Sequence, residues 1–224
     1  MAACKVLVWE DPRLIDKVGH LIYPDGQNKG RGSGALDIGQ FDRQEEVLWP
    51  DGCAAMYRKE MLDRIGGFDE DFFAYGDDAE LGLRGRIAGW RCIYTPAAVV
   101  RHHRSSTLGK DSSYRLELIE RNRLLLAFKL FPWSLLLLNP FYFAARVVAG
   151  FRAAGRGEGD TVHFPGARGK WRMAKAFVKG DLGALRLFPR MLRKRAEIRS
   201  LRRLSPGEVR HLILSHRLSL KEST

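Results

Sequence analysis

The chain has 224 residues, of which 45% are hydrophobic and 29% are charged, and this composition excludes an intrinsically disordered protein. Lysine and arginine number 38 against 26 aspartates and glutamates, a formal net charge of +12. We therefore expect an acidic partner, such as anionic lipid, nucleic acid or a phosphorylated ligand. Cys4, Cys53 and Cys92 form no CxxC pair, which argues against a zinc knuckle or a secreted disulfide scaffold and favours a reducing compartment.

The first part of the chain predicts strands, a loop and a short helix. The apolar run from Ala3 to Trp9 predicts a strand and lacks the features of a secretory signal. Residues 19–46 are rich in Gly, Asp, Asn and Gln and predict a long flexible loop, either a plain connector or one that closes over a site. Cys53 to Tyr57 predicts a strand, and Lys59 to Ile65 predicts a helix ended by two glycines.

The middle of the chain predicts two helices around a strand. The first helix should begin at Asp77, run to about Ala88 and bury Leu81 and Ile87. The segment "RCIYTPAAVV" predicts a strand with a break at Pro96. A second helix is expected from about Ser112 to Leu130. Its expected apolar positions include Leu116, Ile119, Leu124 and Phe128.

The most apolar stretch is "LFPWSLLLLNPFYFAARVVAGF". Charged, polar and proline residues interrupt or border it: Lys129, Pro132, Asn139, Pro140 and Arg146. A membrane-spanning helix needs roughly 20 mostly apolar residues in a row. We therefore predict one or two interfacial or re-entrant helices here rather than a full span.

Beyond Gly155 the chain becomes basic. Leu185, Phe188 and Leu192 lie at helical spacing among cations, a pattern typical of a cationic helix on an anionic membrane surface. The alternative is a solvated helix packed on the domain by its apolar stripe. The surrounding cations are Arg190, Arg193, Lys194, Arg195, Arg199, Arg202 and Arg203.

The segment "GGFDEDFFAYGDDAELGLRGRIAGW" gathers carboxylates beside aromatic rings in an otherwise basic chain. Asp77 and Glu80 have the spacing of a helix capping box, and Asp69 can simply fix a turn. Capping does not account for Asp78. A carboxylate held at a helix N-terminus is a suitable general base for a hydroxyl, and the neighbouring rings would offer flat faces to a sugar.

This segment, followed by "PAAVVRHH" and "SST", resembles the acceptor-side half of family 2 glycosyltransferases of GT-A fold, especially the bacterial rhamnosyltransferase-like branch. Members carry the pattern G-G-F-D-E-x-F-F-x-Y-x-E-D-x-D-L-x-x-R, and the likeness covers about residues 50–125. The resemblance implies inverting transfer of a sugar from a nucleotide-sugar to an acceptor hydroxyl. The acceptor would be a carbohydrate or a lipid-linked molecule in cell-surface polysaccharide or glycolipid synthesis.

The resemblance also implies a set of site residues. The family's E-D pair falls on Asp77 and Asp78, the catalytic pair, with Asp78 as the base that takes the acceptor proton. Asp77 and Glu80 depart from the usual Glu and Asp, which keeps the charge and changes the reach. The residues expected to bind substrate are Gly52, Asp69, Glu70, Phe73, Glu80, Arg84 and Trp90.

A divalent metal, Mg²⁺ or Mn²⁺, is implied as the cofactor. His102 matches the family histidine that helps to hold the ion on the diphosphate, but His103 follows it, so the register is open by one residue. A structural role is the alternative for either histidine. Most metal ligands are expected in a donor-binding half, because the D-x-D motif of the family is absent before Asp51.

The expected fold is therefore α/β. Residues 1–130 would form the acceptor-side half of a GT-A-type domain without its N-terminal nucleotide-binding half, and residues 131–224 a mainly α-helical, basic, membrane-associating region. The chain would be a fragment of a longer protein, a split enzyme whose partner chain carries the donor half, or a degenerate relative that only binds. We expect it to be inactive without the donor half.

The expected location is cytoplasmic, at the inner face of the plasma membrane. The alternative function is a non-catalytic membrane- or polyanion-binding module, or a pseudoenzyme derived from such an enzyme. We expect no nucleic-acid partner, because the basic segment lacks the interleaved aromatics on which bases stack.

Overall fold

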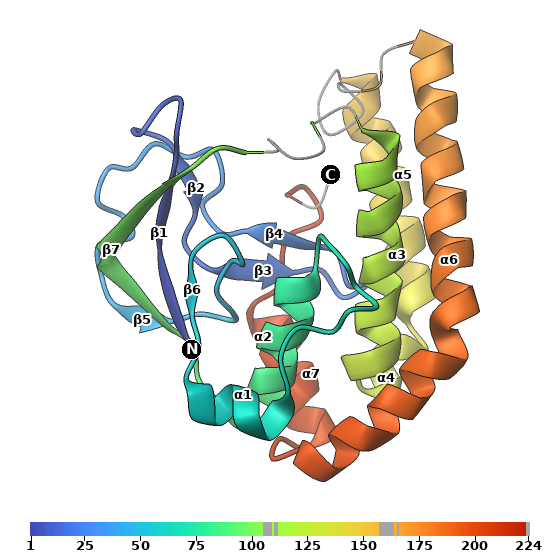
Figure 1. Cartoon of the computed structure of the whole chain (residues 1–224). Coiled ribbons are helices and arrows are strands. Elements are labelled where there is room, and N and C mark those ends of the chain that lie inside the picture. The colour runs from blue at the N-terminus through green and yellow to red at the C-terminus, as the bar shows by residue number, and fades with distance from the viewer. Residues whose placement is uncertain (105–108, 110–111, 157–163, 165, 223–224) are drawn as a thin grey trace.

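The computed structural model describes residues 1–104, 109, 112–156, 164 and 166–222. A curled sheet lies on one side of the molecule, a layer of long helices lies on the other, and a small hairpin lies between them (Figure 1). The expected α/β class is confirmed. The "SST" motif of the resemblance, residues 105–107, lies outside the described residues.

The main sheet is built around strand β1, Ala2–Val8, where a strand was predicted. β1 pairs in parallel with β7, Ile93–His102, and the register slips between Cys4 opposite Thr95 and Lys5 opposite Val99. The slip confirms the break predicted at Pro96, since a proline cannot donate a ladder hydrogen bond. The remaining strands are β2 (Ile15–Lys17) and β6 (Ala55–Met56) against β1, and β5 (Glu45–Glu46) against β7.

The prediction of a flexible loop over residues 19–46 is wrong for its first half. Strands β3, His20–Ile22, and β4, Asn28–Gly30, form an antiparallel hairpin there. Ile22 and Tyr23 are buried, and Gly26 turns the chain with φ of 103°, a conformation that glycine adopts readily. The hairpin is ordered because its side chains enter the core. Strands of only three residues are too short to give a periodic pattern that would predict this.

Most helices begin and end close to their predicted bounds. Asp77 does begin α2, and Leu81 and Ile87 are fully buried as expected. The predicted helix from Ser112 is α3, with Ser112 as its N-cap. The helices are α1 (Lys59–Ile65), α2 (Asp77–Ile87), α3 (Ser113–Leu130), α4 (Trp133–Leu136), α5 (Asn139–Gly155), α6 (Gly166–Leu201) and α7 (Pro206–Ser215).

The core joins α2 to the helical layer. Trp49 is fully buried against α2, where a Cβ on Gly82 would lie 2.2 Å from the Trp49 Cβ, so only glycine permits this contact. In α3 the buried apolar side chains include Leu118, Leu125 and Leu126, together with Leu116 from the predicted set. The other predicted positions, Ile119, Leu124 and Phe128, are partly buried. The difference arises because α3 is packed on more than one side, by α2 and by α6.

Charged groups are buried where α3, α5 and the hairpin meet. Arg146 of α5 donates to Asp25 at 2.7 Å and to Glu120 at 2.9 and 3.0 Å. Arg123 of α3 donates to Glu120 at 2.9 Å. Each of these side chains is at most 8% exposed, and buried charges require such pairing. The network fixes the hairpin turn to the helices.

The apolar segment after Leu130 forms α4 and α5. No described helix combines the length and the apolar character needed to cross a bilayer. Arg146 is turned inward into the ion network, whereas Phe141 and Phe151 are 73% and 72% exposed. The division at residue 130 and the membrane association of the second region stay predictions.

The apolar stripe predicted for the basic helix is corrected in part. Phe188 packs against Phe128 of α3, with ring centroids 4.7 Å apart, but Leu185 is 56% exposed. The described residues place both within α6, whose buried positions are Ala176, Gly180, Ala184, Met191 and Ile198. Of these two residues, Phe188 is therefore held against α3, whereas Leu185, one turn earlier, remains exposed.

Candidate active site

The candidate site lies at the start of α2. Gly76 is the N-cap residue, with φ of 95°, and no side chain caps the helix. The predicted capping box of Asp77 and Glu80 is therefore wrong. Glu80 instead accepts hydrogen bonds from Arg84 at 2.8 Å. Because its carboxylate is engaged in this i,i+4 ion pair, it does not cap the helix.

Asp78 is held by backbone amides. Its Oδ2 accepts a hydrogen bond from the Gly52 N–H at 3.0 Å, and its Oδ1 accepts from the Ala79 N–H at 2.8 Å. A Cβ on Gly52 would lie 3.3 Å from the Asp78 Cβ. The predicted base and the predicted glycine are thus brought together, with the Asp78 side chain 14% exposed.

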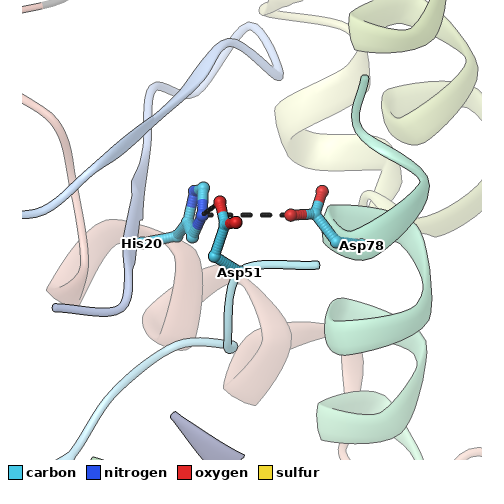
Figure 2. A group of neighbouring side chains, drawn as sticks. All are labelled: His20, Asp51 and Asp78. Carbon is cyan, nitrogen blue, oxygen red and sulfur yellow. Dashed lines mark hydrogen bonds and ion pairs between the residues drawn. The ribbon is translucent and has the colours of Figure 1, made fainter. Parts of the chain in front are cut away.

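Two residues absent from the predicted site lie beside Asp78 (Figure 2). His20, at the start of β3, and Asp51, in the loop before β6, are joined by a 2.9 Å contact between Nε2 and Oδ2. The same His20 nitrogen is 3.9 Å from the Asp78 Oδ2. We refer to these three residues as the His20–Asp51–Asp78 cluster.

Asp51 is the most strongly held acid of this cluster. Lys17 donates to its Oδ2 at 2.8 Å, and the Cys53 N–H donates to its Oδ1 at 2.9 Å. Burial alone would raise the pKa of Asp51, but the hydrogen bond and charge of His20, together with the charge of Lys17, lower the pKa far below its usual range. Asp51 is therefore an anion at neutral pH.

Neighbouring groups are shifted in the opposite direction. Burial, followed by the negative charge of Asp78, raises the pKa of Asp77. Burial, followed by the charge of Asp51, raises the pKa of the Cys53 thiol, so this cysteine is not an activated nucleophile. Carboxylates whose pKa values are shifted in opposite directions, as for Asp51 and Asp77, are typical of acid–base sites.

The cluster is also a possible cation site. The three ligand atoms lie within 4.8 Å of one another, and the described part of the chain contains no other group of this kind. One nitrogen and two carboxylate oxygens suit Mn²⁺ or a similar ion. An ion there would have to displace Lys17 from Asp51, and within the described residues His20 Nδ1 has no second-shell partner.

His102 is connected to this cluster through Asp16 and Lys17, and its ring contact is one that metal-bound histidines commonly make. Its Nδ1 contacts the Asp16 Oδ2 at 2.8 Å, which leaves Nε2 as the ligand atom and gives the carboxylate–histidine arrangement common behind metal-bound histidines. Asp16 is 3.7 Å from Lys17 Nζ, which contacts Asp51. His103 instead stacks on Trp9 at 4.5 Å, so of the two histidines His102 is the one linked to the cluster.

The acidic residues before α2 are engaged by lysines of the helical layer. Asp69 contacts Lys129 at 2.6 Å and also pairs with Lys194. Burial alone would raise the pKa of Asp69, but these lysines lower it to about 2. Asp71 contacts Lys194 at 2.6 Å and Arg190 at 2.9 Å. Of this acidic stretch, Glu70 is exposed.

Glu80, Arg84 and Trp90 have internal contacts in this arrangement. Glu80 is fully buried and Arg84 is 4% exposed. Besides Glu80, Arg84 donates to the carbonyls of Gly66 and Gly67 at 3.1 and 2.6 Å, which ties the glycine turn to α2. Trp90 packs on a small apolar cluster around Met61. The substrate contacts predicted for these residues stay predictions.

The loop before Gly76 has an unusual backbone. Phe73 and Tyr75 have φ of 59° and 65°, a region that side chains other than glycine rarely adopt and that often marks functional loops. Asn122, buried in α3, donates through Nδ2 to the carbonyls of Phe72, Ala74 and Tyr75 at 2.7–2.8 Å. This clamp presents Phe73, which is 70% exposed, to the surroundings.

The best-formed surface hollows lie away from the cluster. One runs along α7, and the other lies on α6 beside Arg190, Arg193 and Lys194. Neither is lined by Asp78 or Gly52.

Sequence reasoning found Asp78 and Gly52 and missed their polar neighbours. His20 and Lys17 lie in or beside the stretch expected to be a loop, and Asp51 was not singled out next to Gly52. Asn122 gives no separate signal either, because α3 also buries the charged side chains of Glu120, Arg123 and Lys129. The others could be found only once the hairpin was known.

Comparison with known proteins finds similarity over a segment that contains Asp51 and Asp78. Residues 34–120 match the family model described as "Glycosyltransferase like family 2". This region is therefore similar to the family 2 glycosyltransferases, and the curated proteins that it resembles include rhamnosyltransferases.

The similar curated proteins are named for rhamnosyl transfer or for O-antigen biosynthesis. The chain is 37% identical over 73 residues to N-acetylglucosaminyl-diphospho-decaprenol L-rhamnosyltransferase of Mycobacterium tuberculosis strain H37Rv, and equally to that of strain CDC 1551. The aligned part is 33% of this chain and 24% of the relative. The O-antigen biosynthesis protein RfbC of Myxococcus xanthus is 37% identical over 60 residues, 27% of this chain and 5% of RfbC. The chain thus aligns with about a quarter, or less, of each relative's length.

Proposed function

We propose that this chain supplies the acceptor side of an inverting glycosyltransferase, with Asp78 as the general base. The observation that carries the proposal is the fixed Asp78 carboxylate at the start of α2, held by the Gly52 amide beside His20 and Asp51. A base must be rigidly placed within hydrogen-bond reach of the proton it abstracts. The family match over this segment supports the same role.

The chemistry proposed for these residues is a single displacement. Asp78 accepts the proton of the acceptor hydroxyl while that oxygen bonds to the anomeric carbon of the sugar, and the nucleoside diphosphate leaves from the opposite face. Lys17 and His20 both contact the carboxylate of Asp51, and the three side chains form a compact set beside the base. Their contribution is to hold the Gly52 loop, and with it Asp78, in position.

A divalent cation belongs to the proposal as cofactor. His102 would bind it through Nε2 while Asp16 holds the ring from Nδ1. When bound, such an ion neutralises charge on a leaving diphosphate. We propose that most of its other ligands, and the nucleotide-sugar site itself, come from a donor-binding half in further sequence or in a partner chain.

The acceptor class follows from the relatives' names. One relative is a rhamnosyltransferase named for an N-acetylglucosaminyl-diphospho-decaprenol substrate, and another is an O-antigen biosynthesis protein. We propose a carbohydrate or lipid-linked acceptor in cell-envelope polysaccharide synthesis, and action at the inner face of the plasma membrane.

The test is sugar transfer by Asp78→Asn, with the donor-binding half supplied. Asparagine keeps the shape and an oxygen for the Gly52 N–H but cannot accept the proton, so we expect a loss of about 10²- to 10⁴-fold in turnover. The matched control is Asp63→Asn, which neutralises an exposed acid of α1. Undiminished transfer by Asp78→Asn would remove the base assignment.

A further inference from the structure

The inward face of α6 is fixed by its packing on α3. Ala176, Gly180, Ala184 and Met191 are buried. A Cβ on Gly180 would lie 2.7 Å from the Glu117 carbonyl oxygen, so the two helix backbones touch. The orientation of α6 about its own axis is therefore determined.

The opposite face of α6 carries a second apolar stripe. Trp171, Val178, Leu182 and Leu185 are 71%, 58%, 50% and 56% exposed. Their spacings of seven, four and three residues place them on one side of a helix, about half a turn from the buried stripe. α6 forms the outer edge of the helical layer (Figure 1), and the described residues leave this stripe largely uncovered.

The exposed stripe is flanked by cations. The exposed basic residues of this part of α6 include Arg168, Arg172, Lys175, Lys179 and Arg186. The whole helix contains two acids, Asp181 and Glu197. Asp181 is turned toward α3, where it accepts from Arg123 at 3.2 Å. The exposed face between Trp171 and Leu185 is thus apolar in its centre and positive along its margin.

We propose that this face, the α6 outer face, docks on an anionic lipid bilayer. Its four apolar side chains would enter the headgroup boundary while the five cations contact lipid phosphates, as in helices that lie in the membrane interface. The inference deepens the membrane association in the proposed function by assigning it to one face. It differs from the sequence prediction, because Phe188 packs on α3 and takes no part.

Charge and side-chain type select lipid over other occupants. A second copy of the chain would bring the same positive margin, and like charges face to face oppose a symmetric dimer. Single-stranded nucleic acid needs several aromatic rings for stacking, and this stripe has one, Trp171. A bilayer with acidic headgroups satisfies both the apolar centre and the cationic margin.

The same helix reaches the candidate site. Two turns beyond the stripe, Lys194 bonds to Asp69 and Asp71, and Arg190 pairs with Asp71. These acids belong to the loop that leads to Phe73 and α2. When the α6 outer face docks on the membrane, this loop would therefore be held by ion pairs to the same helix that contacts the lipid.

The experiment measures binding of the full chain to vesicles of phosphatidylcholine, with and without phosphatidylglycerol, by co-sedimentation. Binding should require phosphatidylglycerol and weaken as salt is raised. The double variant Val178→Asp and Leu182→Asp should bind at least about tenfold less. Its matched control is Leu36→Asp and Ile38→Asp, two exposed apolar residues outside α6, which should bind as the parent does.

A second pair of variants tests the margin. Arg172→Glu, Lys179→Glu and Arg186→Glu should abolish the preference for phosphatidylglycerol. The control changes the exposed Arg43, Arg58 and Arg64 to Glu, which alters net charge equally. Equal loss in both triple variants would overturn the proposal, as would unchanged binding of the Val178 and Leu182 variant.

The other occupants are outcomes of the same series. Stripe-dependent dimerisation in sedimentation velocity, or stripe-dependent retention of DNA without vesicle binding, would also overturn the proposal. None of these measurements uses sugar transfer. Failure here therefore leaves the Asp78 assignment standing, and failure of Asp78→Asn leaves the α6 outer face standing.

Discussion

At the scale of single residues, the placement of Asp78 depends on a glycine. The Gly52 amide donates to its carboxylate, and the space above Gly52 is limited by the Asp78 Cβ. A sequence can suggest this pairing only through a family pattern, because the two residues are 26 positions apart. The pattern did identify both. The contact of His20 with Asp51 could not be predicted, because His20 lies in a hairpin whose composition is typical of a loop.

Gly52→Ala should impair transfer without unfolding the chain. The added methyl would lie 3.3 Å from the Asp78 Cβ, so the loop must shift by a few tenths of an ångström and the base moves with it. We expect kcat/KM to fall by about tenfold. Gly67→Ala is the control, because a Cβ there meets nothing within 4 Å. Equal kcat/KM values for the two variants would contradict the geometry.

Asp69 should make the fold sensitive to acid. Its pKa is lowered to about 2 by Lys129 and Lys194, below the ordinary value near 3.9. A lowered pKa contributes stability that is present above the unfolded-state value and is lost as pH falls through about 2. Chemical unfolding of Asp69→Asn should therefore show less loss of stability between about pH 4 and pH 2 than the parent. Parallel curves would contradict this assignment.

At the scale of elements, local patterns succeeded where an element supplies its own signal. β1, α1, α2 and α3 each have a long apolar period or a terminating glycine, and the structure places them within a residue or two of their predicted bounds. The capping box failed because Glu80 is taken by Arg84 and Lys129, a competition that the first-turn pattern does not show. The β3–β4 hairpin failed because its order comes from buried contacts with distant helices.

Arg146 should be essential to that order. Arg146→Met would leave Asp25 and Glu120 with fewer cations in a site where both are at most 1% exposed. Removing one partner of a buried ion pair costs about 3–5 kcal/mol. Urea unfolding should show this loss, whereas Arg152→Met, at an exposed position of the same helix, should change stability by less than about 0.5 kcal/mol. Similar losses in the two variants would mean that the network does not hold the hairpin.

At the scale of the whole molecule, the cluster lies where sheet-side and helix-side elements meet. His20 comes from the hairpin, Asp51 from the loop before β6, and Asp78 from α2 (Figure 2). The α/β class and the position of Asp78 at the start of a helix could be predicted from sequence, since both rest on patterns within one segment. The contacts of Arg84 with Glu80 and with the glycine turn could not be predicted, and neither could the exposed apolar stripe of α6. Each depends on which side of its helix is covered by neighbouring elements.

The central claim is that Asp78 acts in the chemical step rather than in binding the acceptor. The most direct measurement is the separate determination of kcat and the acceptor KM for Asp78→Asn, with the donor half and nucleotide-sugar in excess. The account predicts that kcat falls by at least about 10²-fold while KM stays within about threefold of the parent value. A raised KM with unchanged kcat would show that Asp78 only binds the acceptor, and would contradict the account.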